Sequence, residues 1–161
     1  MTLAAYNADL PRRQANFQPL TPLSLLERAA HVFPDRTAII HGPARTSYGD
    51  FYARSRRLAS ALMARGIGRG DTVSALLFNT PPMLEAHYGV PMTGAVLNAI
   101  NTRLDAAGIA FILDHAEAKL LILDRELAPL ARAALALAKA RPLLVEYDDP
   151  TAPGAETLGG E

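Results

Sequence analysis

The sequence contains no cysteine among its 161 residues. This absence excludes disulfide bonds, zinc sites built on thiolates and a cysteine nucleophile. Any metal site would therefore depend on histidine and carboxylate side chains. An excess of one charge is missing too, because 16 lysine and arginine residues balance 16 aspartate and glutamate residues. Without a positive field to attract a phosphate backbone, we expect no nucleic acid partner.

A long apolar run is also missing. Charged residues or prolines interrupt every candidate stretch, both near the N-terminus and further along the chain. A signal peptide needs a continuous apolar region, and a membrane-spanning helix needs about 20 apolar residues. We therefore expect no signal peptide, no membrane span and a cytoplasmic location.

What the sequence does contain is an alternation of helix-like and strand-like stretches. Thr21 is a typical N-cap, and the apolar helical spacing that follows it ends at Pro34. Residues 37–47 hold a β-branched stretch, turn residues and a second short strand, which together predict a hairpin. A further helix is expected from Ser47 to Arg65.

The rest of the ordered region alternates between strands and helices. Buried strands are expected at residues 72–78, 95–99 and 120–123, and a last short strand is expected at 143–145. Helices are expected at 82–93, at 105–115 with Asp105 as the N-cap, and at 127–138. Since helices connect successive strands, right-handed crossovers and a mainly parallel sheet are expected. The predicted fold class is therefore α/β, with a mainly parallel sheet, helical crossovers and an N-terminal hairpin.

The composition also predicts domain limits. Residues 1–20 carry Pro11 and Pro19 and are expected to form an extended lead-in. Residues 21–147 are expected to form the ordered domain. Residues 148–161 lose the apolar period, which is typical of a flexible tail.

The glycine-rich segment 66–70 does not match a dinucleotide-binding loop. The fingerprint G-x-G-x-x-G follows a strand and opens a helix, so that backbone amides meet a pyrophosphate. Here the expected order is reversed, with a helix before the glycines and a strand after them. We interpret the segment as a helix-ending turn.

The histidines give no metal motif. None of them shows the spacing H-x-H or H-E-x-x-H. They are His31, His41, His87 and His115. Glu85 and His87 are two residues apart and point in different directions on a helix, so a proton relay would need other partners. Asp114 and His115 fit a helix end, where a cationic imidazole is stabilised by the last carbonyls.

The remaining charged clusters also have simple interpretations. Arg54, Arg56 and Arg57 lie on the polar side of a helix without interleaved aromatic residues, which favours a solvated face over a nucleic acid site. Asp148 and Asp149 fall in the expected tail, where motion defeats acid–base placement. A G-x-S-x-G motif is absent. Motifs alone therefore predict no catalytic, cofactor-binding or metal-ligating residue.

Five stretches nevertheless carry a family resemblance, in the same order and spacing. They are residues 33–40 (FPDRTAII), 46–48 (TSY), 66–73 (GIGRGDTV), 79–98 (NTPPMLEAHYGVPMTGAVLN) and 101–104 (NTRL). Together they resemble the N-terminal portion of an acyl-CoA synthetase of the AMP-binding, adenylate-forming superfamily, and most closely a short- or medium-chain fatty acid–CoA ligase. The resemblance implies that residues 21–147 form a partial N-terminal AMP-binding domain, which is a partial N-terminal lobe of the adenylate-forming ligase fold.

The resemblance implies a two-step reaction in the full-length family. A carboxylate attacks the α-phosphate of ATP with help from magnesium, and the thiol of CoA then displaces AMP. Family members use a Ser/Thr/Gly-rich loop with a lysine, an acidic metal ligand, a ribose-binding aspartate and a lysine on a mobile C-terminal domain. None of these motifs is found, and the only lysines, Lys119 and Lys139, do not lie in such a loop. No site residue is carried over, and ATP, Mg and CoA are expected only for the full-length family.

The sequence therefore predicts an N-terminal segment of an ATP-dependent carboxylic acid–CoA ligase, acting on a fatty or other carboxylic acid. The isolated chain is predicted to be inactive. One alternative is that a complementary downstream polypeptide completes a split ligase. Another is a non-catalytic α/β binding module, which would unfold in one cooperative transition and stay a monomer.

Overall fold

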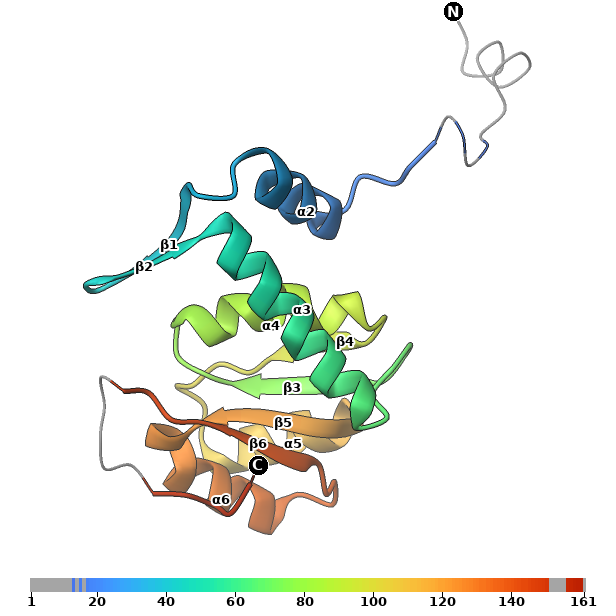
Figure 1. The fold of residues 1–161 in the computed structure, drawn as a ribbon. Coiled ribbons are helices and arrows are strands. Elements are labelled where there is room, and N and C mark those ends of the chain that lie inside the picture. Colours follow the sequence, from blue (N-terminus) through green and yellow to red (C-terminus); the bar gives the residue numbers. More distant parts are fainter. Residues whose placement is uncertain (1–12, 14, 16, 151–155, 161) are drawn as a thin grey trace, which may run out of the picture.

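The computed structural model describes residue 13, residue 15, residues 17–150 and residues 156–160. Its helices and strands occupy most of residues 22–147 (Figure 1). In chain order they are α2 (Pro22–Val32), β1 (Thr37–His41), β2 (Ala44–Ser47), α3 (Tyr48–Ala64), β3 (Thr72–Leu76), α4 (Pro81–Met92), β4 (Val96–Ala99), α5 (Ala106–His115), β5 (Ala118–Asp124), the 3-10 helix η1 (Arg125–Leu127), α6 (Ala128–Leu137) and β6 (Leu143–Tyr147). Among the described residues, no helix is both long and apolar enough to cross a lipid bilayer.

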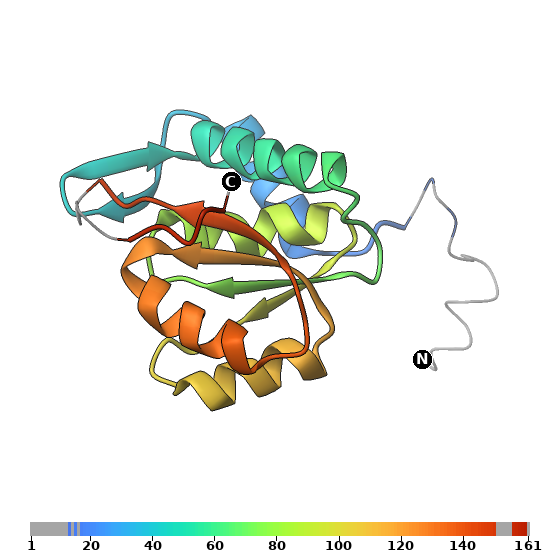
Figure 2. The same cartoon turned by 90° about the horizontal axis from the view of Figure 1, so that it is seen from below.

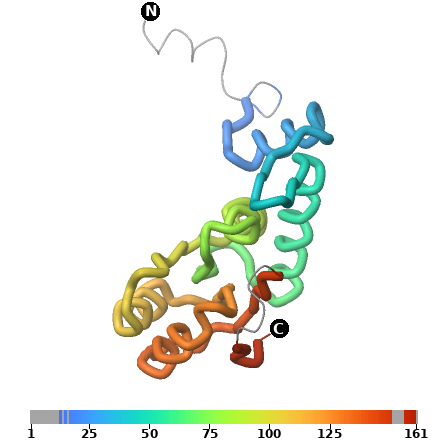
Figure 3. Tube along the Cα trace, turned by 90° about the vertical axis from the view of Figure 1, so that its left-hand side faces the viewer, coloured from blue at the N-terminus to red at the C-terminus, as the bar shows by residue number. Residues whose placement is uncertain are grey.

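The centre of the fold is a four-stranded sheet with the strand order β4-β3-β5-β6, in which every pair is parallel. Helices α3 and α4 pack on one face, and α5 and α6 pack on the other (Figure 2). The hairpin β1–β2 is antiparallel and forms a separate sheet beside the start of α3. Figure 3 shows the chain passing from α2 and this hairpin into the layered body. The α/β prediction is confirmed.

The sequence of strand β5 is almost continuously apolar, and the burial of its side chains explains this pattern. Leu120, Leu121 and Leu123 are fully buried. Leu120 belongs to the apolar cluster beneath α3 and α4, whereas Leu121 and Leu123 belong to the cluster beneath α5 and α6. A parallel strand covered on both faces needs apolar side chains in both directions.

The helix starts follow from local hydrogen bonds that the sequence predicts. The hydroxyl of Thr21 accepts from the N–H of Ser24 at 3.2 Å, and the carboxylate of Asp105 accepts from the N–H of Gly108 at 2.8 Å. Such N-caps satisfy donors that have no partner inside the helix, and each contributes about 1 kcal/mol. Both predicted caps are confirmed.

At residues 95–99 the prediction of a strand is confirmed, but the prediction that this strand is buried is wrong. Strand β4 forms an edge of the sheet, and the side chain of Val96 is 55% exposed. Leu97 packs towards α4 and its neighbours, but the opposite face of the strand is left open. An apolar run indicates a strand, but it does not show whether both faces are covered.

The expected tail at 148–161 lies partly outside the described residues. Residues 156–160 are described, and they contact β6 through Glu146, whose carboxylate accepts from the N–H groups of Leu158 and Gly160 at 2.6 and 2.9 Å. The hydroxyl of Thr157 donates to the same carboxylate at 2.6 Å. The domain limits themselves stay a prediction.

Helices α3 and α4 approach closely at Gly89, which gives a test of the packing. A methyl group there would lie 2.8 Å from Leu58 Cδ2 and 2.9 Å from the carbonyl oxygen of Ser55. Overpacking costs up to about 3 kcal/mol, and the helix propensity of alanine offsets about 1 kcal/mol. We therefore expect Gly89→Ala to lower the free energy of unfolding by about 2 kcal/mol in urea titrations. Gly68→Ala is the control, since nothing lies within 4 Å of a methyl group there, and equal losses in the two variants would contradict the packing argument.

Candidate functional site

The topology of the sheet marks one edge as the place for a site. Strands β3 and β5 are neighbours, but the chain leaves β3 for α4 on one face and leaves β5 for α6 on the other. Where connections diverge in this way, the carboxyl ends of parallel strands border a crevice, and ligands of open α/β sheets bind there.

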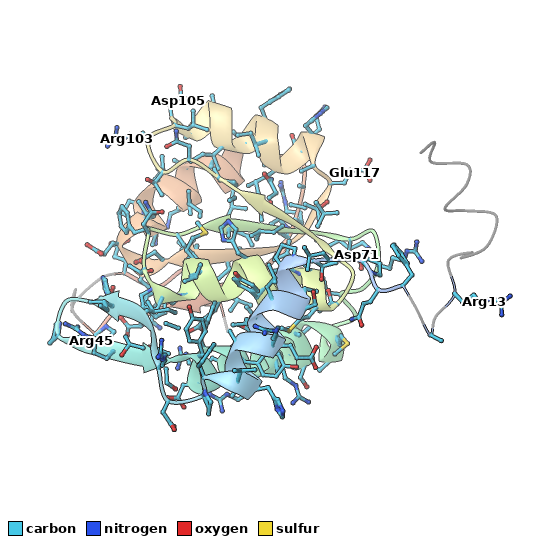
Figure 4. The ribbon with its side chains drawn as sticks, turned by 90° about the horizontal axis from the view of Figure 1, so that it is seen from above. Arg13, Arg45, Asp71, Arg103, Asp105 and Glu117 are labelled. Atoms are coloured by element: carbon cyan, nitrogen blue, oxygen red, sulfur yellow. The ribbon has the colours of Figure 1, made fainter. Side chains whose placement is uncertain are left out.

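A crevice of about 900 Å³ lies at this edge, and we call it the carboxyl-edge crevice. The loops after β3 and β4, the first turns of α4 and one residue after β5 form its walls. They are Leu77, Phe78, Asn79, Met83, His87, Ala99, Ile100, Asn101, Thr102, Arg103 and Leu127. Figure 4 shows Arg103 at this edge, on the opposite side of the molecule from Asp71 and Glu117.

The polar side chains of the carboxyl-edge crevice differ in the donor and acceptor atoms that they leave available. The side-chain oxygen of Asn101 accepts from the N–H of Arg103 at 3.0 Å, which fixes the loop after β4. The exposed guanidinium of Arg103 offers a fixed positive charge. Nδ1 of His87 lies 2.8 Å from the carbonyl oxygen of Met83, and since a carbonyl can only accept, Nδ1 carries the proton. In the neutral ring, Nε2 is therefore left as an acceptor.

A smaller, mainly apolar groove adjoins this crevice, and we call it the hairpin groove. It lies between β1 and the start of α4 and measures about 290 Å³. Ile39, Ile40 and Leu84 provide much of its apolar surface, and Met83 and His87 line both the groove and the crevice. The two spaces therefore form one continuous surface that is apolar at one end and polar at the other.

The residues Glu85 and His87 make separate contacts, as their spacing on a helix indicates. The nearly buried carboxylate of Glu85 pairs with the half-exposed guanidinium of Arg54, and Arg54 Nη2 lies 3.3 Å from Glu85 Oε2. This hydrogen bond from α3 to α4 raises the pKa of Arg54. Arg54 is therefore an interhelical contact rather than part of a solvated face, while Arg56 lies over the ring of Tyr52.

A buried acid, Asp124, ends strand β5 at the same edge of the sheet. One oxygen accepts from the N–H of Glu126 at 3.1 Å, and among the described residues the other has no hydrogen-bond partner. Burial raises the pKa of Asp124, and the negative charges of Asp149 and Asp148 raise it further. The surroundings of Asp124 therefore favour its protonated form more than water does.

The other residues considered from sequence lie away from the carboxyl-edge crevice. Lys119 pairs with Asp71 at 2.6 Å, next to the glycine turn at residues 66–70, which lies between α3 and β3 as expected. The ring of His115 stacks on Phe111. His31 lies on α2, His41 ends β1 and Lys139 follows α6. Over the described ranges, no three histidine or acidic side chains come close enough to share a metal ion.

Sequence reasoning missed the residues that line the crevice. Asn79, Asn101 and Arg103 lie just after predicted strands, in stretches that carry the family resemblance. The rule that ligands bind at the carboxyl ends of parallel strands would have singled them out. It needs the order of strands in the sheet, which the sequence does not contain.

Comparisons with known proteins agree with this architecture. The sequence profile of the AMP-binding enzyme family matches residues 26–159. The chain is 46% identical over 150 residues to the peroxisomal acetate/butyrate–CoA ligase AAE7 of Arabidopsis thaliana, a match that covers 89% of this chain and 26% of the relative. It is 50% identical over 129 residues to the peroxisomal benzoate–CoA ligase of Arabidopsis thaliana, covering 80% of this chain and 22% of that protein. The chain thus spans about a quarter of the length of these curated relatives.

Solved structures show the same fold. The benzoate CoA ligase of Burkholderia xenovorans superimposes with a TM-score of 0.74 at 27% identity, over 84% of this chain and 27% of that chain. The N-terminal domain of FACL13 from Mycobacterium tuberculosis superimposes with a TM-score of 0.67 at 32% identity, over 77% of this chain and 32% of that chain. The matched part is thus about a third of the N-terminal domain of FACL13. This chain belongs to the AMP-binding enzyme family.

Proposed function

We propose that this chain supplies the N-terminal α/β segment of an ATP-dependent carboxylic acid–CoA ligase. The whole enzyme would convert an acid, ATP and CoA into acyl-CoA, AMP and diphosphate. The observation that supports this proposal is the identity of 46–50% to acid–CoA ligases over 80–89% of the chain. The proposed substrate is a short- or medium-chain fatty acid, in keeping with acetate and butyrate, which the name of AAE7 gives as its substrates.

The surface at the carboxyl edge is compatible with an acid substrate. Arg103 offers a guanidinium, which binds carboxylates, and the hairpin groove beside the crevice is apolar. In the proposed role, these residues bind and orient the substrate against the rest of the enzyme. No residue of this chain is assigned a chemical step.

The residues present do not fit a magnesium–triphosphate. Over the described ranges, no group of three acidic or histidine side chains could hold a metal ion. Lys119 is paired with Asp71, and Lys139 follows α6 outside the crevice. ATP, Mg and CoA are therefore proposed as cofactors of the complete ligase.

The proposal is tested by reconstitution. We expect the isolated chain to show no exchange of labelled diphosphate into ATP with acetate, butyrate or hexanoate. The phosphate loop, its lysine and the acidic metal ligand, which would stabilise the negative charge on the reacting phosphates, are not found in the sequence. Mixing the isolated chain with the part of AAE7 that follows the matched segment, or fusing the two, is expected to restore butyryl-CoA formation. That part of AAE7 alone is the control. Exchange of diphosphate by the isolated chain would contradict the predicted inactivity. If neither the mixture nor the fusion forms butyryl-CoA, the proposed function is wrong.

A second candidate is a non-catalytic binding module. Helices cover both faces of the sheet between β3 and β5, so the described part has a core of its own. A stable monomer that restores no activity would favour this candidate. The expected cytoplasmic location stays a prediction, since AAE7 and the Arabidopsis benzoate ligase are both named as peroxisomal proteins.

A further inference from the structure

A further polar space lies apart from the carboxyl-edge crevice, and we call it the arginine notch after Arg45, Arg54 and Arg57. It lies where the hairpin, α3, the start of α4 and the chain after β6 meet, and it measures about 510 Å³. Figure 2 shows the hairpin and the carboxyl end of β6 on the same side of the molecule. The notch shares His41 and Pro81 with the hairpin groove, but it shares no lining residue with the crevice. The arginine notch is therefore a separate surface.

The charges of the arginine notch balance, because three arginines and three acidic residues line it. Most of them are already held in place. The nearly buried carboxylate of Glu85 pairs with Arg54. The carboxylate of Asp50 accepts from the hydroxyl of Ser47 at 2.8 Å. Arg45 donates to two carbonyl oxygens of the hairpin turn, at 2.8 and 2.9 Å.

Arg57 and Tyr147 supply the donors that stay available in the notch. Arg57 follows Arg54 by about one helical turn on α3, so both side chains lie on the same side of the helix. Within the part of the chain that the structure describes, no hydrogen bond or ion pair engages the guanidinium of Arg57 or the hydroxyl of Tyr147. Burial raises the pKa of Tyr147, and the negative charges of Asp149 and Asp124 raise it further, so the hydroxyl keeps its proton. Two available donors, one of them charged, suit an oxyanion.

Rings form much of the remaining wall of the notch. They belong to Pro43, Pro81, Pro82, Pro150 and Tyr147. A proline ring is already rigid, so it offers apolar surface without losing side-chain entropy on binding. We therefore expect a ligand with an apolar body beside its charged group. Because the charges of the notch balance and one guanidinium is available, a single negative charge fits better than a polyanion.

We propose that the arginine notch binds a small organic monocarboxylate with an apolar, ring-sized body. The guanidinium of Arg57 donates two parallel N–H groups to the carboxylate, and the hydroxyl of Tyr147 donates to one of its oxygens. The apolar body packs against the proline rings. This inference goes beyond the proposed function, because the proposed function places the acid substrate at the crevice and the hairpin groove and assigns no role to Arg57 or Tyr147.

Titration of the full chain with benzoate, followed by nuclear magnetic resonance, tests the inference. We expect a dissociation constant of about 1 mM, with the largest shifts at the Nε–H of Arg57 and the ring of Tyr147. Benzamide has the same ring without the charge, and inorganic phosphate has the charge without the ring. Each is expected to bind at least about ten-fold more weakly than benzoate.

Variants locate the bound acid. Arg57→Gln removes the charge and is expected to weaken benzoate binding by about ten-fold. Tyr147→Phe keeps the ring, removes the hydroxyl and is expected to weaken binding by about three-fold. Arg28→Gln is the matched control, because Arg28 is an exposed arginine on α2 outside the notch, and its affinity is expected to stay within about two-fold. Circular dichroism shows whether each variant is folded, and Tyr147→Phe keeps the test valid if Arg57→Gln unfolds.

The outcomes separate this inference from the proposed function. If benzoate does not bind, or binds Arg57→Gln and Tyr147→Phe as tightly as the wild type, the inference is wrong. Equal binding of benzamide or of phosphate would also overturn it, since the ligand would then need no charge or no apolar body. If Arg103→Gln weakens binding and Arg57→Gln does not, the acid binds in the carboxyl-edge crevice. That result overturns the inference and leaves the proposed function standing.

Discussion

Replacing Leu121 with alanine is expected to lower the free energy of unfolding by about 3 kcal/mol. Leu121 is fully buried in the middle of β5, where it is paired with Ser74 of β3 and with Leu144 of β6. Its side chain lies in the cluster beneath α5 and α6, and the cavity left by alanine adds to the lost burial.

Urea titrations of the full chain measure this loss. Leu137→Ala is the control, because Leu137 is 63% exposed on α6. A loss below about 1 kcal/mol for Leu121→Ala would show that the sheet has no tightly packed core at this position.

Glu146 is expected to make the stability of the protein depend on acid pH. Burial would raise the pKa of this carboxyl, but hydrogen bonds from Thr157, Gly160, Leu158 and Arg125 outweigh burial and lower the pKa from 4.5 to about 2. Because the folded pKa lies below the unfolded value, the contribution is complete above pH 4.5 and is lost as the pH falls towards 2. The size of the shift corresponds to about 3 kcal/mol.

The measurement is the free energy of unfolding of the wild type and of Glu146→Gln between pH 6 and pH 2.5. We expect the difference between the two proteins to be largest at pH 6 and to shrink as the pH falls, because glutamine cannot ionise. Glu156→Gln is the matched control, since Glu156 forms an exposed ion pair with Arg132. A constant difference across this range would show that Glu146 acts through shape alone.

Local signals predicted most of the fold. The caps at Thr21 and Asp105, the turn at Gly66 and the apolar strand β5 each depend on neighbouring residues in the sequence, and all are found in the structure. The parallel sheet followed because helices connect its strands. The family resemblance, built on stretches spread over the chain, is confirmed by the family match.

Features that depend on distant residues could not be predicted. The exposure of Val96 depends on which strand lies beside β4, and the pairing of Arg54 depends on Glu85 in another helix. The contact of residues 156–160 with Glu146 could not be predicted, because residues 148–161 show no periodic pattern in the sequence. The carboxyl-edge crevice could not be predicted either, because only the order of the strands brings Asn79 and Arg103 together.

The strand order also constrains how this chain folds during synthesis. Strand β3 lies between β4 and β5, yet β5 is synthesised only after β4 and α5. Until then, one side of β3 has no hydrogen-bonding neighbour and its apolar residues are open to other nascent chains. Such non-local pairing is slow, so the half-made chain is the stage at which we expect chaperones to matter most.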